Sequence, residues 1–124
     1  MAILSLDQGT TSSRAILFDR QFNPLGQINV PLTQHYPKEG WVEHNAMEIF
    51  HTQMQAAGVL LSGINEPIDC IGITNQRETT ILWNSETGEP IAPAIVWQCG
   101  RTAAQCEALS RLMTITVFQL VTTV

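Results

Sequence analysis

Basic residues are scarce in this chain of 124 residues, which has six lysines and arginines against eleven aspartates and glutamates and a formal net charge of −5. No run of positive charge occurs along it. Nucleic acids and anionic membrane surfaces would be repelled, so we expect neither as a main partner. The only lysine is Lys38. The phosphate loop G-x-x-x-x-G-K-[ST] is therefore excluded, and a phosphate site would need a different cradle.

Long apolar runs and paired cysteines are also missing. No run approaches the ~18 apolar residues of a membrane span, and the chain does not begin with a basic segment followed by a long apolar one. Cys70, Cys99 and Cys106 follow neither C-x-x-C metal spacing nor an even-numbered disulfide framework. We therefore expect a cytoplasmic protein. A chain of this length fits one domain that buries about two-thirds of its extended surface.

A turn rich in hydroxyl groups lies between two short apolar runs near the N-terminus. The stretch 3–19 predicts a strand, a turn and a second strand, and Gly9 permits a backbone conformation that a side chain would resist. The turn and its flanks carry groups that can bind an anion or a hydrated Mg²⁺: Asp7, Thr10, Thr11, Ser12, Ser13 and Arg14. This combination indicates a nucleoside triphosphate site. The alternative is an ordinary polar hairpin.

The following segments predict a meander and a helix. Turn residues at 23–26 and polar-apolar alternation over 27–32 indicate a third antiparallel strand. A helix is expected over 46–61, with Asn45 as its N-cap and Glu48 completing a variant of the capping box. Apolar residues recur along it at helical spacing and are expected to face the core: Met47, Phe50, Met54, Ala57 and Leu61.

Residues 68–74 form a short, isoleucine-rich run that is typical of a central strand covered on both faces. The helix before this run would provide the crossover that a parallel neighbour requires. Ligands bind outside the carboxyl ends of strands in open α/β sheets, so the segment 75–78 is a candidate binding loop. A second hairpin is predicted from the runs 79–83 and 91–97, joined by a turn at 85–88.

The character of the chain changes near Met113. A helix is predicted over 101–112, with one stripe made of Thr102, Cys106, Leu109 and Met113. No charged residue follows Arg111, and threonines there mix with apolar residues. We therefore expect a domain over residues 1–112 and a divergent apolar tail over 113–124.

Four motifs occur in one order along the chain, at 7–14, 40–44, 72–80 and 94–98. Together they resemble the N-terminal part of the FGGY carbohydrate kinase family, and the resemblance covers about residues 3–112. It implies an α/β fold of the ribonuclease H-like type shared by actin, Hsp70 and sugar kinases. The expected domain is incomplete, with a mixed sheet, a β-meander and crossover helices. The resemblance also implies ATP-dependent phosphorylation of glycerol to glycerol 3-phosphate.

The resemblance further implies roles for individual residues. Contacts to the ATP phosphates are assigned to Thr10, Thr11, Ser12 and Arg14, and the carboxylate near the metal is Asp7. Glycerol contacts are assigned to Arg77, Glu78 and Trp97. A guanidinium can donate to hydroxyl oxygens while a carboxylate accepts from hydroxyl hydrogens, so such a pair suits a small polyol. The implied cofactors are ATP and Mg²⁺, and the full-length protein is expected to be a homo-oligomer.

A catalytic base is not among the residues that the resemblance assigns. The family's catalytic aspartate lies beyond the length of this chain, so the chain alone is expected to be inactive. Three interpretations stay open. The chain is a piece of an active glycerol-phosphorylating enzyme, a truncated non-catalytic remnant or interaction module, or part of another FGGY polyol or sugar kinase.

Overall fold

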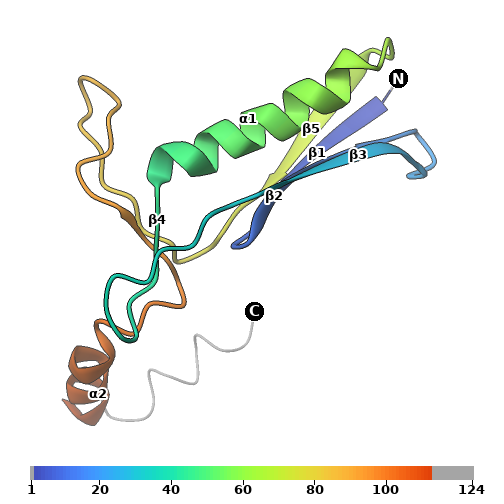
Figure 1. Ribbon diagram of the computed structural model, residues 1–124. Coiled ribbons are helices and arrows are strands. Elements are labelled where there is room, and N and C mark those ends of the chain that lie inside the picture. Colours follow the sequence, from blue (N-terminus) through green and yellow to red (C-terminus); the bar gives the residue numbers. More distant parts are fainter. Residues whose placement is uncertain (1, 113–124) are drawn as a thin grey trace.

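The computed structural model describes residues 2–112 (Figure 1). Four strands form a mixed sheet: β1 (Ala2–Gln8), β2 (Ser12–Phe18), β3 (Pro24–Pro31) and β5 (Ile68–Thr74). Their order is β3-β2-β1-β5, and β1 pairs antiparallel with β2 but parallel with β5. The antiparallel meander predicted for the first three strands is confirmed. The tail expected over 113–124 lies outside the described residues.

The turn between β2 and β3 differs from the prediction. The chain reverses before Pro24, because the Asp19 carboxylate accepts hydrogen bonds from the backbone N–H groups of Gln21 and Asn23, at 2.8 and 2.9 Å. Phe22 takes a positive φ of 63° within this turn. The turn expected at 23–26 is therefore wrong, and β3 starts earlier than the alternating pattern indicated.

The first helix, α1 (Ala46–Ser62), begins where its cap predicts. Asn45 Oδ1 accepts hydrogen bonds from the N–H groups of Met47 and Glu48, at 2.9 and 3.2 Å. The reciprocal half of the capping box does not form, because the Glu48 carboxylate accepts instead from the backbone N–H of Thr33 at 3.0 Å. Glu48 thus ties the start of α1 to the segment that follows β3.

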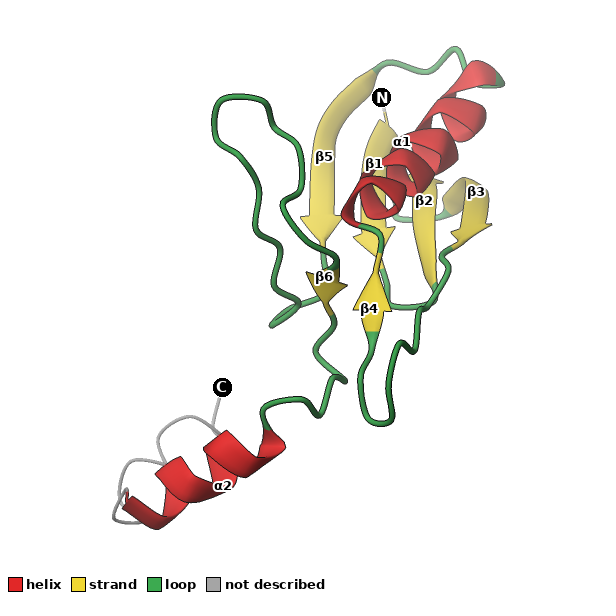
Figure 2. Cartoon of the chain, turned by 60° about the vertical axis from the view of Figure 1, so that its left-hand side comes forward, coloured by secondary structure: helices red, strands yellow, loops and turns green. Residues whose placement is uncertain are grey.

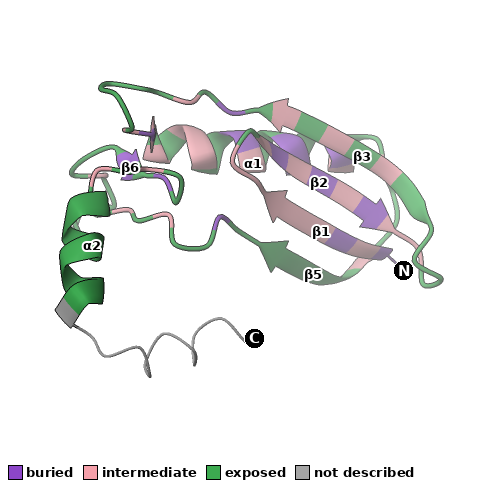
Figure 3. Ribbon diagram, turned by 90° about the horizontal axis from the view of Figure 1, so that it is seen from below, coloured by how far each residue is buried: buried purple, intermediate pink, exposed green. Residues whose placement is uncertain are grey.

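Small residues form the face of α1 that packs on the sheet. The buried residues of the helix are Thr52, Ala56, Ala57 and Leu60. The predicted core stripe is wrong in its larger members, since Met47, Phe50 and Met54 are 39%, 56% and 53% exposed. The hydroxyls of Ser13 and Thr52 lie 2.8 Å apart, so the helix approaches β2 closely on its small-residue face. Figure 3 shows α1 lying along the meander.

The core lies between α1 and the meander. Its buried members are Ala2, Leu4, Ala15, Leu17, Ala56, Ala57 and Leu60. A Cβ built on Gly26 would lie 3.0 Å from Leu60 Cδ1, so the helix approaches β3 closely here and a larger residue would require Leu60 to shift. The alternation of buried and half-buried residues along β2 puts one face of the meander against the helix.

The strand β5 occupies an edge of the described sheet. It runs parallel to β1, and α1 is the connection between β3 and β5, so the predicted crossover is confirmed. The expectation of a central strand covered on both faces is not met within residues 2–112, since Ile71 and Ile73 are 56% and 75% exposed. The helix packs mainly against β2 and β3, which leaves β5 uncovered (Figure 3).

A small second sheet lies beyond the end of α1 nearest its N-terminus (Figure 2). Its strands are β4 (Glu43–His44) and β6 (Ala94–Ile95), paired antiparallel. The predicted second hairpin is confirmed only as two separate bridges, Thr80 to Ile95 and Trp83 to Pro90, without a continuous ladder. Gly88 has a φ of 72°, as its predicted place in the connecting turn requires.

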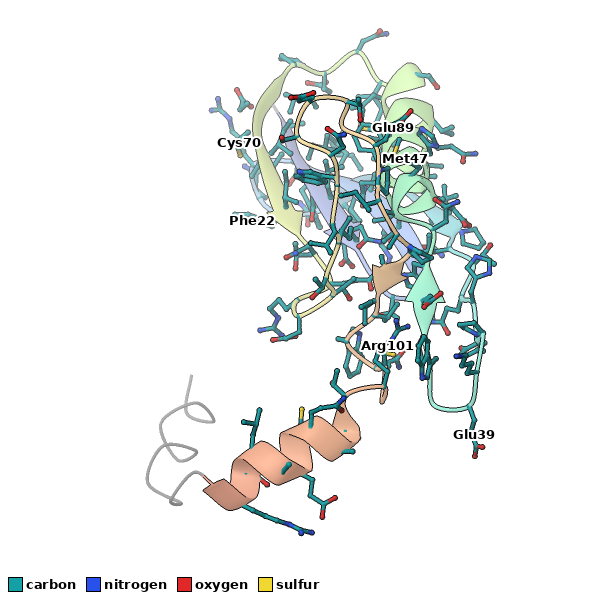
Figure 4. The ribbon with its side chains drawn as sticks, turned by 90° about the vertical axis from the view of Figure 1, so that its left-hand side faces the viewer. Phe22, Glu39, Met47, Cys70, Glu89 and Arg101 are labelled. Atoms are coloured by element: carbon teal, nitrogen blue, oxygen red, sulfur yellow. The ribbon has the colours of Figure 1, made fainter. Side chains whose placement is uncertain are left out.

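The second helix, α2 (Ala103–Leu112), begins two residues later than predicted and stands away from the sheet (Figure 2). Arg101 is not part of it. The Arg101 guanidinium lies 3.9 Å above the ring of Trp41 and 2.6 Å from the Glu43 carboxylate, at the junction between β6 and α2 (Figure 4). Of the predicted stripe, Cys106 and Leu109 are exposed. No helix within residues 2–112 is long and apolar enough to cross a membrane.

We predict that Leu17→Ala lowers the free energy of unfolding by about 2–5 kcal/mol, because Leu17 is fully buried between α1 and the sheet. The matched control Leu25→Ala, at a side chain that is 50% exposed, should change it by less than about 0.5 kcal/mol. Urea unfolding followed by circular dichroism measures both. Equal effects of the two variants would contradict the core described above.

Candidate functional site

A cleft of about 350 Å³ opens at the carboxyl ends of β1 and β5. Because these strands are parallel, the turn after β1 and the loop after β5 leave the sheet at the same edge. The cleft is lined by Asp7, Gln8, Gly9, Thr10, Asn75, Gln76, Arg77, Glu78 and Trp97. The structure therefore brings five of the candidate residues from distant parts of the sequence into one place.

The turn after β1 is tight. The N–H of Gly9 donates to the carbonyl of Ser12 at 2.9 Å, and a Cβ on Gly9 would lie 3.0 Å from that oxygen. The close approach of backbone, not a positive φ, is thus what requires glycine at this position. Thr10 lines the cleft, whereas Thr11 and Ser12 do not. Thr11 is exposed and Ser12 is half-buried.

The hydroxyl of Ser13 belongs to the core. Ser13 is fully buried on the face of β2 that meets α1, and its Oγ lies 2.8 Å from Thr52 Oγ1. The interpretation of Ser13 as part of an anion-binding ring is therefore wrong. Strand alternation explains the difference, since Ser12 and Arg14 lie on the opposite face of the sheet from Ser13.

Asp7 and Arg14 are direct cross-strand partners. Such partners share one face of a sheet, here the face opposite α1. Arg14 is half-buried and is not among the residues that line the cleft. Its Nε is buried without a hydrogen-bond partner among the described residues, so only the outer part of the guanidinium is available to an anion near the turn.

A magnesium ion fits this site only in company with a ligand. Residues 2–112 contain no cluster of three or more His, Cys, Asp or Glu side chains able to hold a metal. Asp7 presents one carboxylate to the cleft. Mg²⁺ commonly binds through one or two carboxylates together with waters and substrate phosphates. The donor set therefore suits an ion that arrives with a nucleotide.

The loop after β5 carries the candidate polyol residues. Arg77 and Glu78 both line the cleft, and Glu78 has a φ of 62°, which is unusual for a residue other than glycine. Trp97 comes from the segment after β6 and is 55% exposed. Its indole Nε1–H donates to Thr10 Oγ1 at 2.9 Å, so the candidate polyol side touches the candidate phosphate turn directly.

Sequence reasoning missed three residues that hold the cleft together. Gln76 Nε2 donates to the carbonyl of Gly9 at 2.9 Å and lies 3.4 Å from His44 Nδ1. The hydroxyl of Thr79 donates to Gln76 Oε1 at 3.1 Å. Gln76 and Thr79 lie within the motif at 72–80, and His44 ends the motif at 40–44. Membership of these motifs was the available signal, but their partners are distant in sequence.

His44 is a neutral, buried imidazole. The side chain is fully buried, and this burial lowers the pKa of His44. The nearby Glu48 carboxylate raises the pKa in part, and His35 lowers it further. The Nδ1 atom of His44 faces the amide nitrogen of Gln76 at 3.4 Å, a contact that favours the tautomer with the proton on Nε2, and Nε2 is buried without a partner among the described residues. A charged imidazole would place a second donor against the Gln76 amide.

A mostly apolar groove of about 510 Å³ adjoins the cleft along α1. It shares Gln8, Asn75 and Gln76 with the cleft, and its other walls include Met47, Phe50, Ile73 and Trp83. It lacks charged side chains, whereas the smaller cleft contains Asp7, Arg77 and Glu78. Of these two adjoining hollows, the cleft is therefore the one with groups suited to charged or polar ligands.

Comparisons with known proteins identify relatives of the chain. The N-terminal domain of the FGGY family of carbohydrate kinases matches residues 2–124. The chain is 57% identical over 110 residues to a glycerol kinase of Aeromonas hydrophila, which covers 86% of this chain and 22% of that protein. A glycerol kinase of Carboxydothermus hydrogenoformans is 56% identical over 110 residues, with the same coverage. The chain spans about a fifth of the length of these relatives.

A solved structure is similar over almost the whole chain. The crystal structure of Plasmodium falciparum glycerol kinase with ADP aligns with a TM-score of 0.85 and 34% identity, covering 95% of this chain and 24% of that one. The ribonuclease H-like α/β fold that the resemblance implied is confirmed.

We predict that acidification destabilises the chain through His44. Because the pKa of His44 is lowered in the folded state, the unfolded state binds the proton more readily. The free energy of unfolding is therefore unaffected by His44 above about pH 6.5 and falls as the pH drops below that value, by at most about 1.4 kcal/mol per pH unit. Urea unfolding between about pH 5 and pH 8 should show a weaker dependence in His44→Gln than in the wild type. The control His51→Gln, at an exposed histidine, should show the same pH dependence as the wild type. An unaltered pH profile in His44→Gln would refute the role of His44.

Proposed function

This chain belongs to the FGGY family of carbohydrate kinases, and we propose that it is the N-terminal part of an enzyme that transfers a phosphoryl group from ATP to glycerol. One observation carries the proposal. The turn suited to phosphate and the Arg77-Glu78 pair suited to a polyol line a single cleft, and Trp97 links them by its hydrogen bond to Thr10. The identity to glycerol kinases supports glycerol as the polyol.

Glycerol would be held from two sides. The Arg77 guanidinium donates to hydroxyl oxygens, and the Glu78 carboxylate accepts from hydroxyl hydrogens. The exposed ring of Trp97 offers an apolar face to the carbon backbone. Because Trp97 is hydrogen-bonded to Thr10, a polyol held by these groups would lie beside the phosphate turn. Orientation of this kind supplies much of the catalysis in phosphoryl transfer.

The nucleotide phosphates would lie at the turn after β1. Thr10 offers a hydroxyl at the cleft, Thr11 and Ser12 offer hydroxyls beside it, and Arg14 offers a positive charge on the strand that follows the turn. Asp7 would hold Mg²⁺ together with the phosphates and bound water. When bound, the ion neutralises charge that develops on the phosphate oxygens.

The proton of the attacking hydroxyl needs an acceptor. The lining carboxylates, Asp7 and Glu78, are engaged in this proposal with the metal and with glycerol hydroxyls. We therefore propose that an aspartate from the region of the relatives that this chain does not cover acts as the base, and that the same region completes the nucleotide site.

The free thiols Cys70, Cys99 and Cys106 agree with a reducing, cytoplasmic setting.

The proposal is tested in a chimera in which residues 1–112 replace the corresponding segment of the Aeromonas hydrophila glycerol kinase. The chimera should phosphorylate glycerol. Arg77→Ala and Glu78→Ala should each raise the KM for glycerol roughly 5- to 150-fold, since each leaves hydroxyl groups unpaired in the cleft. The controls Arg20→Ala and Glu89→Ala remove the same charges from exposed positions and should leave the KM unchanged.

Unchanged glycerol kinetics in both cleft variants would remove Arg77 and Glu78 from the polyol site. A folded chimera that phosphorylates another polyol or sugar but not glycerol would favour a different FGGY specificity.

The 124-residue chain by itself should show no glycerol-dependent formation of ADP. The two carboxylates that line the cleft, Asp7 and Glu78, are assigned here to the metal and to glycerol, and no element within residues 2–112 forms a second wall to exclude water. Alignment of the reactants accounts for about 7–11 kcal/mol of such barriers. A coupled assay for ADP measures turnover, with circular dichroism as the check of folding. Glycerol-dependent ADP release by a folded, contaminant-free sample would show that the chain contains its own base.

A further inference from the structure

A closed ring of hydrogen bonds joins the three segments that form the cleft. Gln76 Nε2 donates to the Gly9 carbonyl at 2.9 Å, and Thr79 Oγ1 donates to Gln76 Oε1 at 3.1 Å. The backbone N–H of Trp97 donates to Thr79 Oγ1 at 3.2 Å, and the Trp97 indole donates to Thr10 Oγ1 at 2.9 Å. The ring closes along the chain, since Gly9 and Thr10 are adjacent.

The Gln76 amide nitrogen and oxygen both have partners within the protein. Its nitrogen serves the Gly9 carbonyl and faces His44 Nδ1, and its oxygen accepts from Thr79. Gln76 is only 8% exposed. The amide therefore has one orientation, and it has no donor left for a substrate although it lines the cleft.

Thr79 fixes the position of the Trp97 backbone. Its hydroxyl hydrogen is directed to Gln76, and a lone pair accepts the backbone N–H of Trp97. The position of the Trp97 backbone sets the position of the indole, which in turn contacts Thr10 in the phosphate turn. A change at Thr79 is thus transmitted to a residue that lines the cleft.

The ring also brackets a strained residue. Glu78 lies between Gln76 and Thr79 and has a φ of 62°. Such a conformation persists in a residue other than glycine only when the surrounding structure holds it. Here both of the residues that flank the Arg77-Glu78 pair are fixed by the ring, so the ring holds the pair in place.

We propose that Gln76 and Thr79 are positioning residues that fix the phosphate turn and the polyol residues relative to each other. The inference rests on the proposed function, because it concerns the alignment of glycerol with the phosphates of ATP. The polar atoms of both residues are hydrogen-bonded within the protein. Loss of the ring therefore reduces kcat more than it weakens binding, since a misaligned pair of reactants is bound but reacts slowly.

Two substitutions at Thr79 test the proposal in the chimera. Thr79→Val removes the hydroxyl with little change of shape, whereas Thr79→Ser keeps it. Thr79→Val should lower kcat at least about tenfold with less than about a threefold change in either KM, and Thr79→Ser should keep most of the activity. Thr87→Val is the matched control, because Thr87 is an exposed threonine in the turn before Gly88. It should leave kcat unchanged.

Gln76→Glu supplies a second, independent variant. The substitution keeps the shape of the side chain but puts an oxygen against the Gly9 carbonyl. The kcat of Gln76→Glu should fall as in Thr79→Val, and the double variant should lose little more than the poorer single variant, because both break one ring. Gln55→Glu, at an exposed position on α1, controls for the added charge. Additive losses would mean that the two residues act separately and would overturn the proposal.

A measurement without turnover separates this inference from the proposed function. In ¹⁵N-labelled chain, the indole N–H resonance of Trp97, assigned by its loss in Trp97→Phe, should shift in Thr79→Val and stay in place in Thr79→Ser. An inactive parent chimera whose chain shows this shift would count against glycerol phosphorylation while supporting the ring. If the parent chimera is active and its Thr79→Val variant has the same kcat as its Thr79→Ser variant, the positioning role is overturned. The same holds if Thr79→Val lowers the melting temperature of the chimera but not its kcat.

Discussion

The parallel pairing of β1 with β5 determines where the candidate ligand-binding residues lie, because it brings the carboxyl ends of both strands to one edge of the sheet. Asp7 is opposite Thr74 in this pairing, so the turn at 8–11 and the loop at 75–78 begin side by side. A parallel neighbour needs a crossover, and α1 supplies it. The hydroxyl contact between Ser13 and Thr52 fixes that helix on β2. These contacts within the protein place the two sides of the cleft next to each other without any ligand.

Strand pairing alone would leave the two loops close but loosely related. Hydrogen bonds within and between these loops and the segment after β6 make them a single unit: Gln76 to Gly9, Thr79 to Gln76, and Trp97 to Thr79 and Thr10. The burial of His44 behind Gln76 keeps the imidazole neutral, which agrees with an amide donor facing it. Gln76 thus both shapes the cleft and packs against the histidine buried behind it.

Local chemistry explains what could be predicted from the sequence. The oxygen of Asn45 and the glycine at 88 predicted a helix start and a turn correctly, because each acts within a few residues. Periodicity predicted α1 but not the face that packs on the sheet, since the small residues around Ala56 are buried there and the stripe that contains Phe50 is exposed. The apolar run of β5 suggested burial, yet no described element covers it. Gln76 could not be placed because its partner, Gly9, is remote in sequence.

The central claim is that one cleft holds the polyol beside the phosphate turn. A crystal structure of the chimera with glycerol and a non-hydrolysable ATP analogue tests it most directly. Glycerol should contact Arg77 and Glu78 through its hydroxyls and Trp97 through its carbons, with the terminal phosphate of the analogue at the turn that contains Thr10. Glycerol bound away from Arg77 and Glu78, or a triphosphate that does not touch the turn after β1, would contradict the claim.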